Sequence, residues 1–318
     1  MISRRLLRVK VLMELYAYDR REDSDLEKAE KELLFSIGKA YDLYHYIFLL
    51  ITELADIASE KIDLALQKKM PTSEDLNPNR RFVDNPVINI LRNNSAIRKH
   101  LASSKLTWSA SPDVPRAIFN KMLQWDSYIE YMSAPRTTFT DDKKFIVKLV
   151  TEFFSQSDDL TSEFEEQSIY WNDDLEYMLA MAAKTIKKFK PGSGEDEQVM
   201  PLYKDKEDAE FVIKLFRKAI SSATTSKEII DSNTTNWEIE RIALMDTLVM
   251  QLAITEIAEF PEIPVKVTLN EYIEIAKFFC TSKSSTFVNG ILDKVVRQMR
   301  EQGTFTKTGR GLVGETDE

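Results

Sequence analysis

Apolar residues recur at helical spacing along most of the chain, and short polar or proline-bearing stretches separate the periodic segments. No segment shows the sustained alternation of apolar and polar positions that is typical of a β-strand. The pattern therefore predicts an all-α protein. We expect a long helical segment from about residue 24 to 69, with a break at Gly38, and further helices near residues 4–18, 86–104, 114–132, 141–156, 173–190, 205–222 and 237–259.

Two capping boxes predict where helices begin. Ser24 and Glu27 have the spacing that lets two side chains satisfy two free backbone donors, and Thr268 and Glu271 repeat it. The second box predicts a helix that starts at Thr268 and ends near residue 279. Glycine inside a helix costs about 1 kcal/mol relative to alanine, so we expect another backbone to pass close to Gly290 in the last helix.

Proline and glycine divide the chain into four predicted parts. Residues 1–70 form the N-terminal helices, 71–200 a helical region, 201–302 a C-terminal bundle and 303–318 a tail. The tail holds four of the eight glycines, and we therefore expect it to be disordered.

The composition is that of a globular protein with a sizeable core, because 43% of the residues are hydrophobic. The only cysteine, Cys280, excludes an internal disulfide and suits a reducing compartment. The apolar runs, such as residues 46–51, are too short to span a membrane. Arginines interrupt every apolar run in the first ten residues, so we expect no signal peptide there. We expect a soluble, cytoplasmic protein with no membrane partner.

The net charge of −9 argues against extended coating of nucleic acid, but the charge is uneven. Residues 1–10 and 86–111 carry basic side chains and no acid. Any contact with RNA should therefore be local.

The residues that could carry catalysis are poorly placed for it. His45 and His100 have no partner at metal-ligand spacing, and no phosphate-binding or nucleophile motif occurs. The paired acids, such as Asp141 and Asp142, fall at predicted helix starts, where they complement the helix dipole. We expect no enzyme activity, no cofactor and no metal site.

The most specific signal lies in residues 264–294, which read PVKVTLNEYIEIAKFFCTSKSSTFVNGILDK. This run resembles the NusB family of transcription antitermination factors, whose last helices read much like P-x-K-V-x-x-N-E-x-I-E-x-A-K followed by F-V-N-G-x-L-D. Residues 3–16 resemble the arginine-rich opening of the family. Residues 237–256 resemble its central helix, although Met250 and Gln251 stand where the family usually has Leu-Arg.

The resemblance covers about residues 1–20 and 205–302. It implies a NusB-like helical bundle assembled from these two parts and enlarged by the inserted helical region. It also implies binding of a boxA-type single-stranded RNA together with NusE, a small-subunit ribosomal protein, within the RNA polymerase antitermination complex.

The resemblance places RNA contacts on the first helix and near the start of the last. Arg4 and Arg8 are neighbours on one helix face, where guanidinium groups hold phosphates well. Aromatic rings supply platforms on which RNA bases stack. The expected RNA-binding residues are Arg4, Arg5, Arg8, Tyr16, Phe287 and, in the turn before it, Lys283.

Other interpretations of the same residues stay open. The arginines can form a solvated helix face, and Tyr16 and Phe287 can belong to the core. The chain can then be a helical interaction scaffold that does not bind RNA. A weaker alternative is a non-catalytic relative of the RNA-binding domain of ribosomal RNA methyltransferases.

Overall fold

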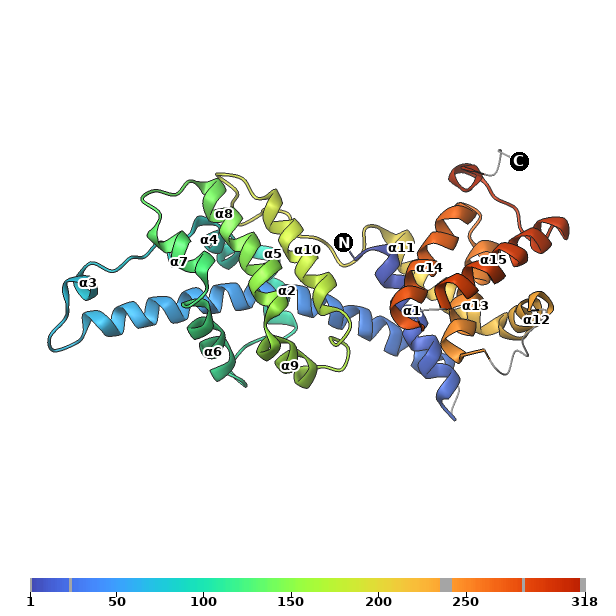
Figure 1. Ribbon diagram of the computed structural model, residues 1–318, viewed down its shortest axis with the longest axis horizontal. Helices are drawn as coiled ribbons and strands as arrows, with labels where there is room; N and C mark the ends of the chain where they lie inside the picture. Colours follow the sequence, from blue (N-terminus) through green and yellow to red (C-terminus); the bar gives the residue numbers. More distant parts are fainter. Residues whose placement is uncertain (1, 23–24, 235–241, 282–283, 315–318) are drawn as a thin grey trace. The chain divides into compact units, whose positions relative to one another are not determined.

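The computed structural model describes residues 2–22, 25–234, 242–281 and 284–314 (Figure 1). Within these ranges the chain forms fifteen α-helices and no strand, which confirms the all-α fold class. None of the described helices combines the length and the apolar character needed to cross a membrane. The chain divides into two compact units: a terminal unit, Met1–Ile37 with Pro201–Glu318, and a middle unit, Gly38–Met200.

The terminal unit joins the two ends of the chain. Its elements are α1 (Arg4–Arg20), the start of α2 (Leu26–Leu66), α11 (Lys206–Ser221), α12 (Ala223–Asn233), α13 (Leu244–Glu259), α14 (Val265–Phe279), α15 (Ser284–Glu301) and a 3-10 turn, Gly309–Leu312.

Helix α13 forms the centre of the terminal unit. It contacts α1, α11, α12, α14 and α15, and every residue from 246 to 257 is buried. In Figure 1 its neighbours surround it. A helix with no solvent-facing side must satisfy its polar side chains internally. Gln251 accordingly donates to the Ala219 carbonyl at 2.8 Å, and Asp246 accepts from the Ser284 hydroxyl at 2.8 Å.

The middle unit contains the rest of α2 and the helices up to residue 200. These are α3 (Ser73–Leu76), α4 (Pro86–Asn93), α5 (Ser95–Ser103), α6 (Asp113–Met122), α7 (Asp126–Ser133), α8 (Phe139–Lys148), a π-helical turn (Leu149–Phe153), a 3-10 turn (Phe154–Gln156), α9 (Asp158–Gln167) and α10 (Leu175–Lys188). Aromatic rings dominate its core. Tyr46 stacks on Trp108 with ring centres 4.4 Å apart, and Tyr131 stacks on Phe145 at 4.0 Å.

Two of the expected helices are each divided in two. Residues 86–104 form α4 and α5, because Asn94 leaves helical geometry and its side chain caps α5 by accepting from the Ile97 amide at 3.0 Å. Residues 114–132 form α6 and α7, with an extended backbone at Trp125. The expected break at Gly38 is absent, because α2 runs through this position without interruption.

The predicted capping box at Thr268 is wrong. Helix α14 begins at Val265, after Pro264 with φ −60° and ψ 140°, so Thr268 lies inside the helix. Its hydroxyl is buried and donates to Glu256 at 2.8 Å, whereas Glu271 binds Arg5. The other predicted box includes Ser24, which lies outside the described residues.

The expectation for Gly290 is also wrong. Among the described residues, no atom beyond its own helix and its chain neighbours lies within 4 Å of a Cβ built at this position, so no described backbone passes close to it.

The tail was expected to be disordered, but its described part packs on the end of α13. The Lys307 ammonium is buried and donates to the carbonyls of Ile257 and Phe260 at 2.9 and 3.0 Å. The Thr308 amide donates to the Pro261 carbonyl at 3.0 Å. Residues 315–318 lie outside the description.

The boundary between the two compact units lies within α2, between Ile37 and Gly38. Residues 38–70 were grouped with the N-terminal helices, but they belong to the middle unit. The reason is that α2 carries its apolar residues, such as Leu50 and Leu54, into the core of that unit.

Candidate nucleic-acid interface

Helix α1 divides its basic residues between two sides. Ser3 caps the helix by accepting from the Leu6 amide at 3.2 Å, and no acid occupies the first turn. Arg4 and Arg8 share the side that packs on the rest of the terminal unit, as the i,i+4 spacing requires. Arg5 lies on the solvent side.

Arg8 is committed to a buried ion pair. Its side chain is 3% exposed, and Nε and Nη2 donate to both carboxylate oxygens of Glu256 at 2.7 Å. Burial lowers the pKa of the guanidinium, but the hydrogen bonds and charge of Glu256 raise it to a net value above the ordinary one. Thr268 and Tyr272 also donate to Glu256, at 2.8 and 3.2 Å. One carboxylate thus joins α1, α13 and α14.

Arg4 makes a second inward contact but stays partly exposed. Its Nε donates to Asp208 at 2.8 Å, and Asp208 is buried in the first turn of α11. The guanidinium groups of Arg4 and Arg8 each lie 5.3 Å from the centre of the Phe211 ring. A cation over an aromatic face is attracted by the ring quadrupole. The expected shared face of Arg4 and Arg8 therefore exists, but it is turned toward α11 and α13.

Arg5 presents its charge at the surface. Its Nε and Nη2 donate to Glu271 on α14 at 2.9 Å each, and its side chain is 47% exposed. The hydrogen bonds from Arg5 lower the pKa of Glu271 below its usual value. Arg8 lies 3.8 Å from the same carboxylate. Glu271 therefore holds Arg5 and Arg8 together at this end of α1.

A line of side chains at helical spacing follows the solvent side of α1. We call it the α1 stripe: Arg5, Val9, Met13, Tyr16 and Arg20. Arg5, Tyr16 and Arg20 are exposed, and the other two are half-exposed. The Arg20 guanidinium lies 5.7 Å from the centre of the Tyr16 ring. Arg5 and Tyr16 are three turns apart, roughly 16 Å along the axis.

The remaining expected site residues lie on other segments. Phe287 is half-buried in the first turn of α15, which packs on α14. Lys283 lies outside the described residues. Arg20 was missed by the sequence analysis, although its spacing from Arg5 and Tyr16 gave the signal. No group of three His, Cys, Asp or Glu side chains that could hold a metal ion occurs in the described ranges.

Comparison with known proteins identifies a family whose model matches the C-terminal part of the chain. A family model described as the NusB family matches residues 176–297. The chain is 39% identical over 137 residues to the transcription antitermination protein NusB of Salinibacter ruber, in a match that covers 41% of this chain and 86% of that protein. The chain belongs to the NusB family.

Two other proteins named transcription antitermination protein NusB match shorter parts. The one from Chloroherpeton thalassium is 40% identical over 104 residues, which is 33% of this chain and 49% of that protein. The one from Natranaerobius thermophilus is 43% identical over 74 residues, which is 23% of this chain and 53% of that protein. No solved structure matches the chain.

The NusB family match includes α11 to α14 and most of α15, and therefore the acceptors of the ion pairs described above. Asp208, Glu256 and Glu271 all fall within the matched residues. Helix α1, which supplies the three arginines, lies before that match.

Proposed function

We propose that this NusB-family chain acts in transcription antitermination by binding a boxA-type single-stranded RNA along the α1 stripe. NusE is the proposed protein partner, within an RNA polymerase antitermination complex. The names of the relatives support the process, and the α1 stripe is the observation that supports the RNA contact.

The chemistry of the α1 stripe suits a single strand. Arg5 and Arg20 lie toward its two ends, where guanidinium groups can donate charge-assisted hydrogen bonds to phosphates. Tyr16 offers an exposed ring between them, on which a base can stack in any sequence context. Val9 and Met13 supply apolar surface for the neighbouring bases or sugars.

The other expected residues take different parts in this proposal. Arg4 is 35% exposed and can add a phosphate contact beside Arg5. Arg8 is buried, so it acts by fixing α1 on α13 rather than by touching RNA. Phe287 is proposed as a second stacking ring, and Lys283 as a phosphate contact near it.

The test is RNA binding by the full chain in the presence of NusE, measured by fluorescence anisotropy with a labelled boxA-type oligonucleotide. Tyr16→Ala removes the stacking ring and should weaken binding by roughly 5- to 150-fold, because stacking contributes about 1–3 kcal/mol per base. Arg5→Ala should weaken binding and reduce the slope of log affinity against log salt by about 1.

The control is Arg98→Ala on α5 of the middle unit. Arg98 is exposed and has the same charge as Arg5, but it is not part of the α1 stripe. Its removal should leave affinity and salt slope unchanged. Equal binding by wild type, Tyr16→Ala and Arg5→Ala would reject the α1 stripe as the RNA surface. A stable NusE complex with no RNA affinity would favour the scaffold interpretation.

A further inference from the structure

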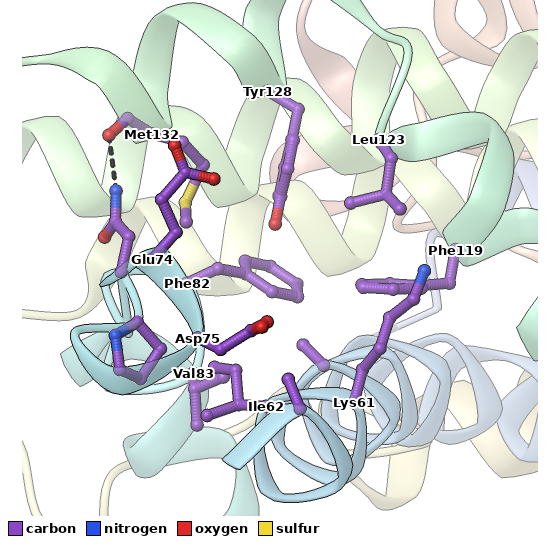
Figure 2. Close-up of a pocket in the computed structure, with 14 residues that line it drawn as sticks. Lys61, Ile62, Glu74, Asp75, Phe82, Val83, Phe119, Leu123, Tyr128 and Met132 are labelled. Carbon is purple, nitrogen blue, oxygen red and sulfur yellow. Dashed lines mark hydrogen bonds between the residues drawn. The ribbon is translucent and has the colours of Figure 1, made fainter. Parts of the chain in front are cut away.

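The middle unit contains a pocket of about 250 Å³ that the proposed RNA contact does not use (Figure 2). It opens between the C-terminal part of α2, the segment from α3 to the turn before α4, and helices α6 and α7. A cavity of about 150 Å³ is large enough for benzene in a protein core. The pocket can therefore hold one ring or one long side chain.

Three aromatic rings form much of its wall. Phe82 and Phe119 are almost fully buried, and Tyr128 meets Phe82 edge to face with ring centres 5.7 Å apart and planes at 77°. This arrangement makes an aromatic corner. Aromatic faces attract organic cations as well as apolar groups.

The chain itself shows that this wall attracts a cation. The Lys61 ammonium lies 5.4 Å from the centre of the Phe119 ring, at the edge of the pocket. Figure 2 places Lys61 on the side of the pocket opposite the Glu74 carboxylate. Lys61 lies over Phe119 and not over the corner formed by Phe82 and Tyr128, so a ligand group can occupy that corner.

Besides the aromatic wall, the Tyr128 hydroxyl also indicates a ligand site. The residue is 8% exposed, and the hydroxyl points into the pocket (Figure 2). Within the described ranges it makes no hydrogen bond. Burial raises the pKa of Tyr128 to about 12, so the hydroxyl stays protonated at neutral pH. The hydroxyl can therefore donate a hydrogen bond to a polar group of a ligand in the pocket, or accept one from it.

Two carboxylates of α3 line the same pocket. Asp75 accepts from Lys68 and from the Thr72 amide, each at 2.8 Å. Lys68 lowers the pKa of Asp75 to about 2, so it is ionised. Glu74 is exposed and has no ion pair within the described part of the chain, so its charge is not compensated there.

We propose that this pocket binds an ammonium or guanidinium group carried on an apolar stem. The stem packs in the aromatic corner of Phe82 and Tyr128, and the cation donates hydrogen bonds to Glu74 and to the Tyr128 oxygen. The group can belong to a free organic amine or to a basic side chain of a polypeptide.

The test uses the full chain with carbon-13 labelled methionine methyl groups, because Met132 lines the pocket and Met299 in the terminal unit serves as an internal reference. Three probes of nearly equal shape are titrated: phenethylamine, 2-phenylethanol and 3-phenylpropionate. The amine should shift the Met132 signal saturably and bind at least tenfold more tightly than the alcohol or the carboxylate.

A second experiment with peptides distinguishes a basic side chain of a polypeptide from a free organic amine as the source of the cation. Acetyl-Leu-Lys-Leu-amide is compared with the same peptide carrying norleucine in place of lysine. Tighter binding of the lysine peptide than of phenethylamine identifies a polypeptide ligand, and the reverse order identifies a small amine. Either order supports the pocket as a cation site.

Variants test whether Glu74 and the Tyr128 hydroxyl contribute to amine binding. Glu74→Gln removes an exposed charge and Tyr128→Phe removes only the hydroxyl, and each should weaken amine binding at least threefold. Glu130→Gln on α7 is the matched control, because Glu130 is exposed and does not line the pocket. The proposal fails if 3-phenylpropionate binds as well as the amine. It also fails if neither cation shifts Met132, or if Glu74→Gln and Glu130→Gln behave alike.

Discussion

Arg8 and Glu256 are 248 positions apart in the sequence and join through two hydrogen bonds of 2.7 Å in the core of the terminal unit. Neither side chain has appreciable contact with solvent. Such a pair contributes less to net stability than its Coulomb energy suggests, because both charges lose their hydration. Its removal on one side only is costly, because the other charge is then left buried.

Arg8→Ala should lower the free energy of unfolding by about 3–5 kcal/mol, since it leaves the Glu256 carboxylate without its cation. Urea unfolding measured by circular dichroism checks this value. Arg5→Ala is the matched control. It breaks an ion pair of similar geometry to Glu271, but at an exposed position, and should cost about 1 kcal/mol or less. Similar losses in the two variants would show that burial of the Arg8 pair does not control its energetics.

His45 should make the middle unit sensitive to acid. Its ring is 1% exposed, and neither ring nitrogen has a hydrogen-bond partner within the described residues. Burial, and then the neighbouring His100, lower its pKa to about 3, whereas Asp42 opposes the shift. The unfolded chain takes up a proton below about pH 6.5, but the folded chain does not until about pH 3.

Stability should therefore be lost as pH falls through this window, by about 2 kcal/mol between pH 7 and 5. Urea unfolding at the two pH values, in wild type and in His45→Leu, measures the contribution. The variant should lose less stability over the same interval. An unchanged pH dependence would assign the acid sensitivity to other groups.

Gly311 should be required for the packing of the tail. A Cβ at this position would lie 1.9 Å from the Pro261 carbonyl oxygen, so Gly311→Ala must displace the segment. The displacement would also break the contacts of Lys307 with the end of α13. Hydrogen exchange measured by mass spectrometry should show faster exchange in residues 303–314. Retained protection in the variant would mean that the tail can shift locally without detaching.

Gly290→Ala should stabilise the protein. The position is helical and exposed, and an added methyl group has open space. Alanine lowers the conformational freedom of the unfolded chain, and the variant should be more stable by about 0.5–1 kcal/mol. Thermal unfolding provides the measurement, and a lower midpoint would contradict the described environment.

The sequence predicted the helices well because apolar spacing is a local property. It failed where a partner distant in the sequence decides the conformation. Thr268 and Glu271 have the spacing of a cap, but Glu256 and Arg5 bind them instead. Arg8 looked like a surface cation because its buried acceptor lies on α13.

The pocket of the middle unit could not be predicted for a similar reason. Its rings and carboxylates come from four segments of the chain. No local pattern indicates that Tyr128, Phe82 and the acids of α3 line one pocket. By contrast, the spacing of Arg5, Tyr16 and Arg20 was available in the sequence, and only the exposed side of α1 had to be known.

The terminal unit is assembled from both ends of the chain, which has a consequence for its biosynthesis. The middle unit is continuous, so all of its residues are synthesised before α11 is made. Helix α1 is synthesised before its packing partners and cannot pack fully until α11, α13 and α14 emerge. For most of translation its apolar side is therefore open to chaperones, and the final fold must wait for the last third of the polypeptide.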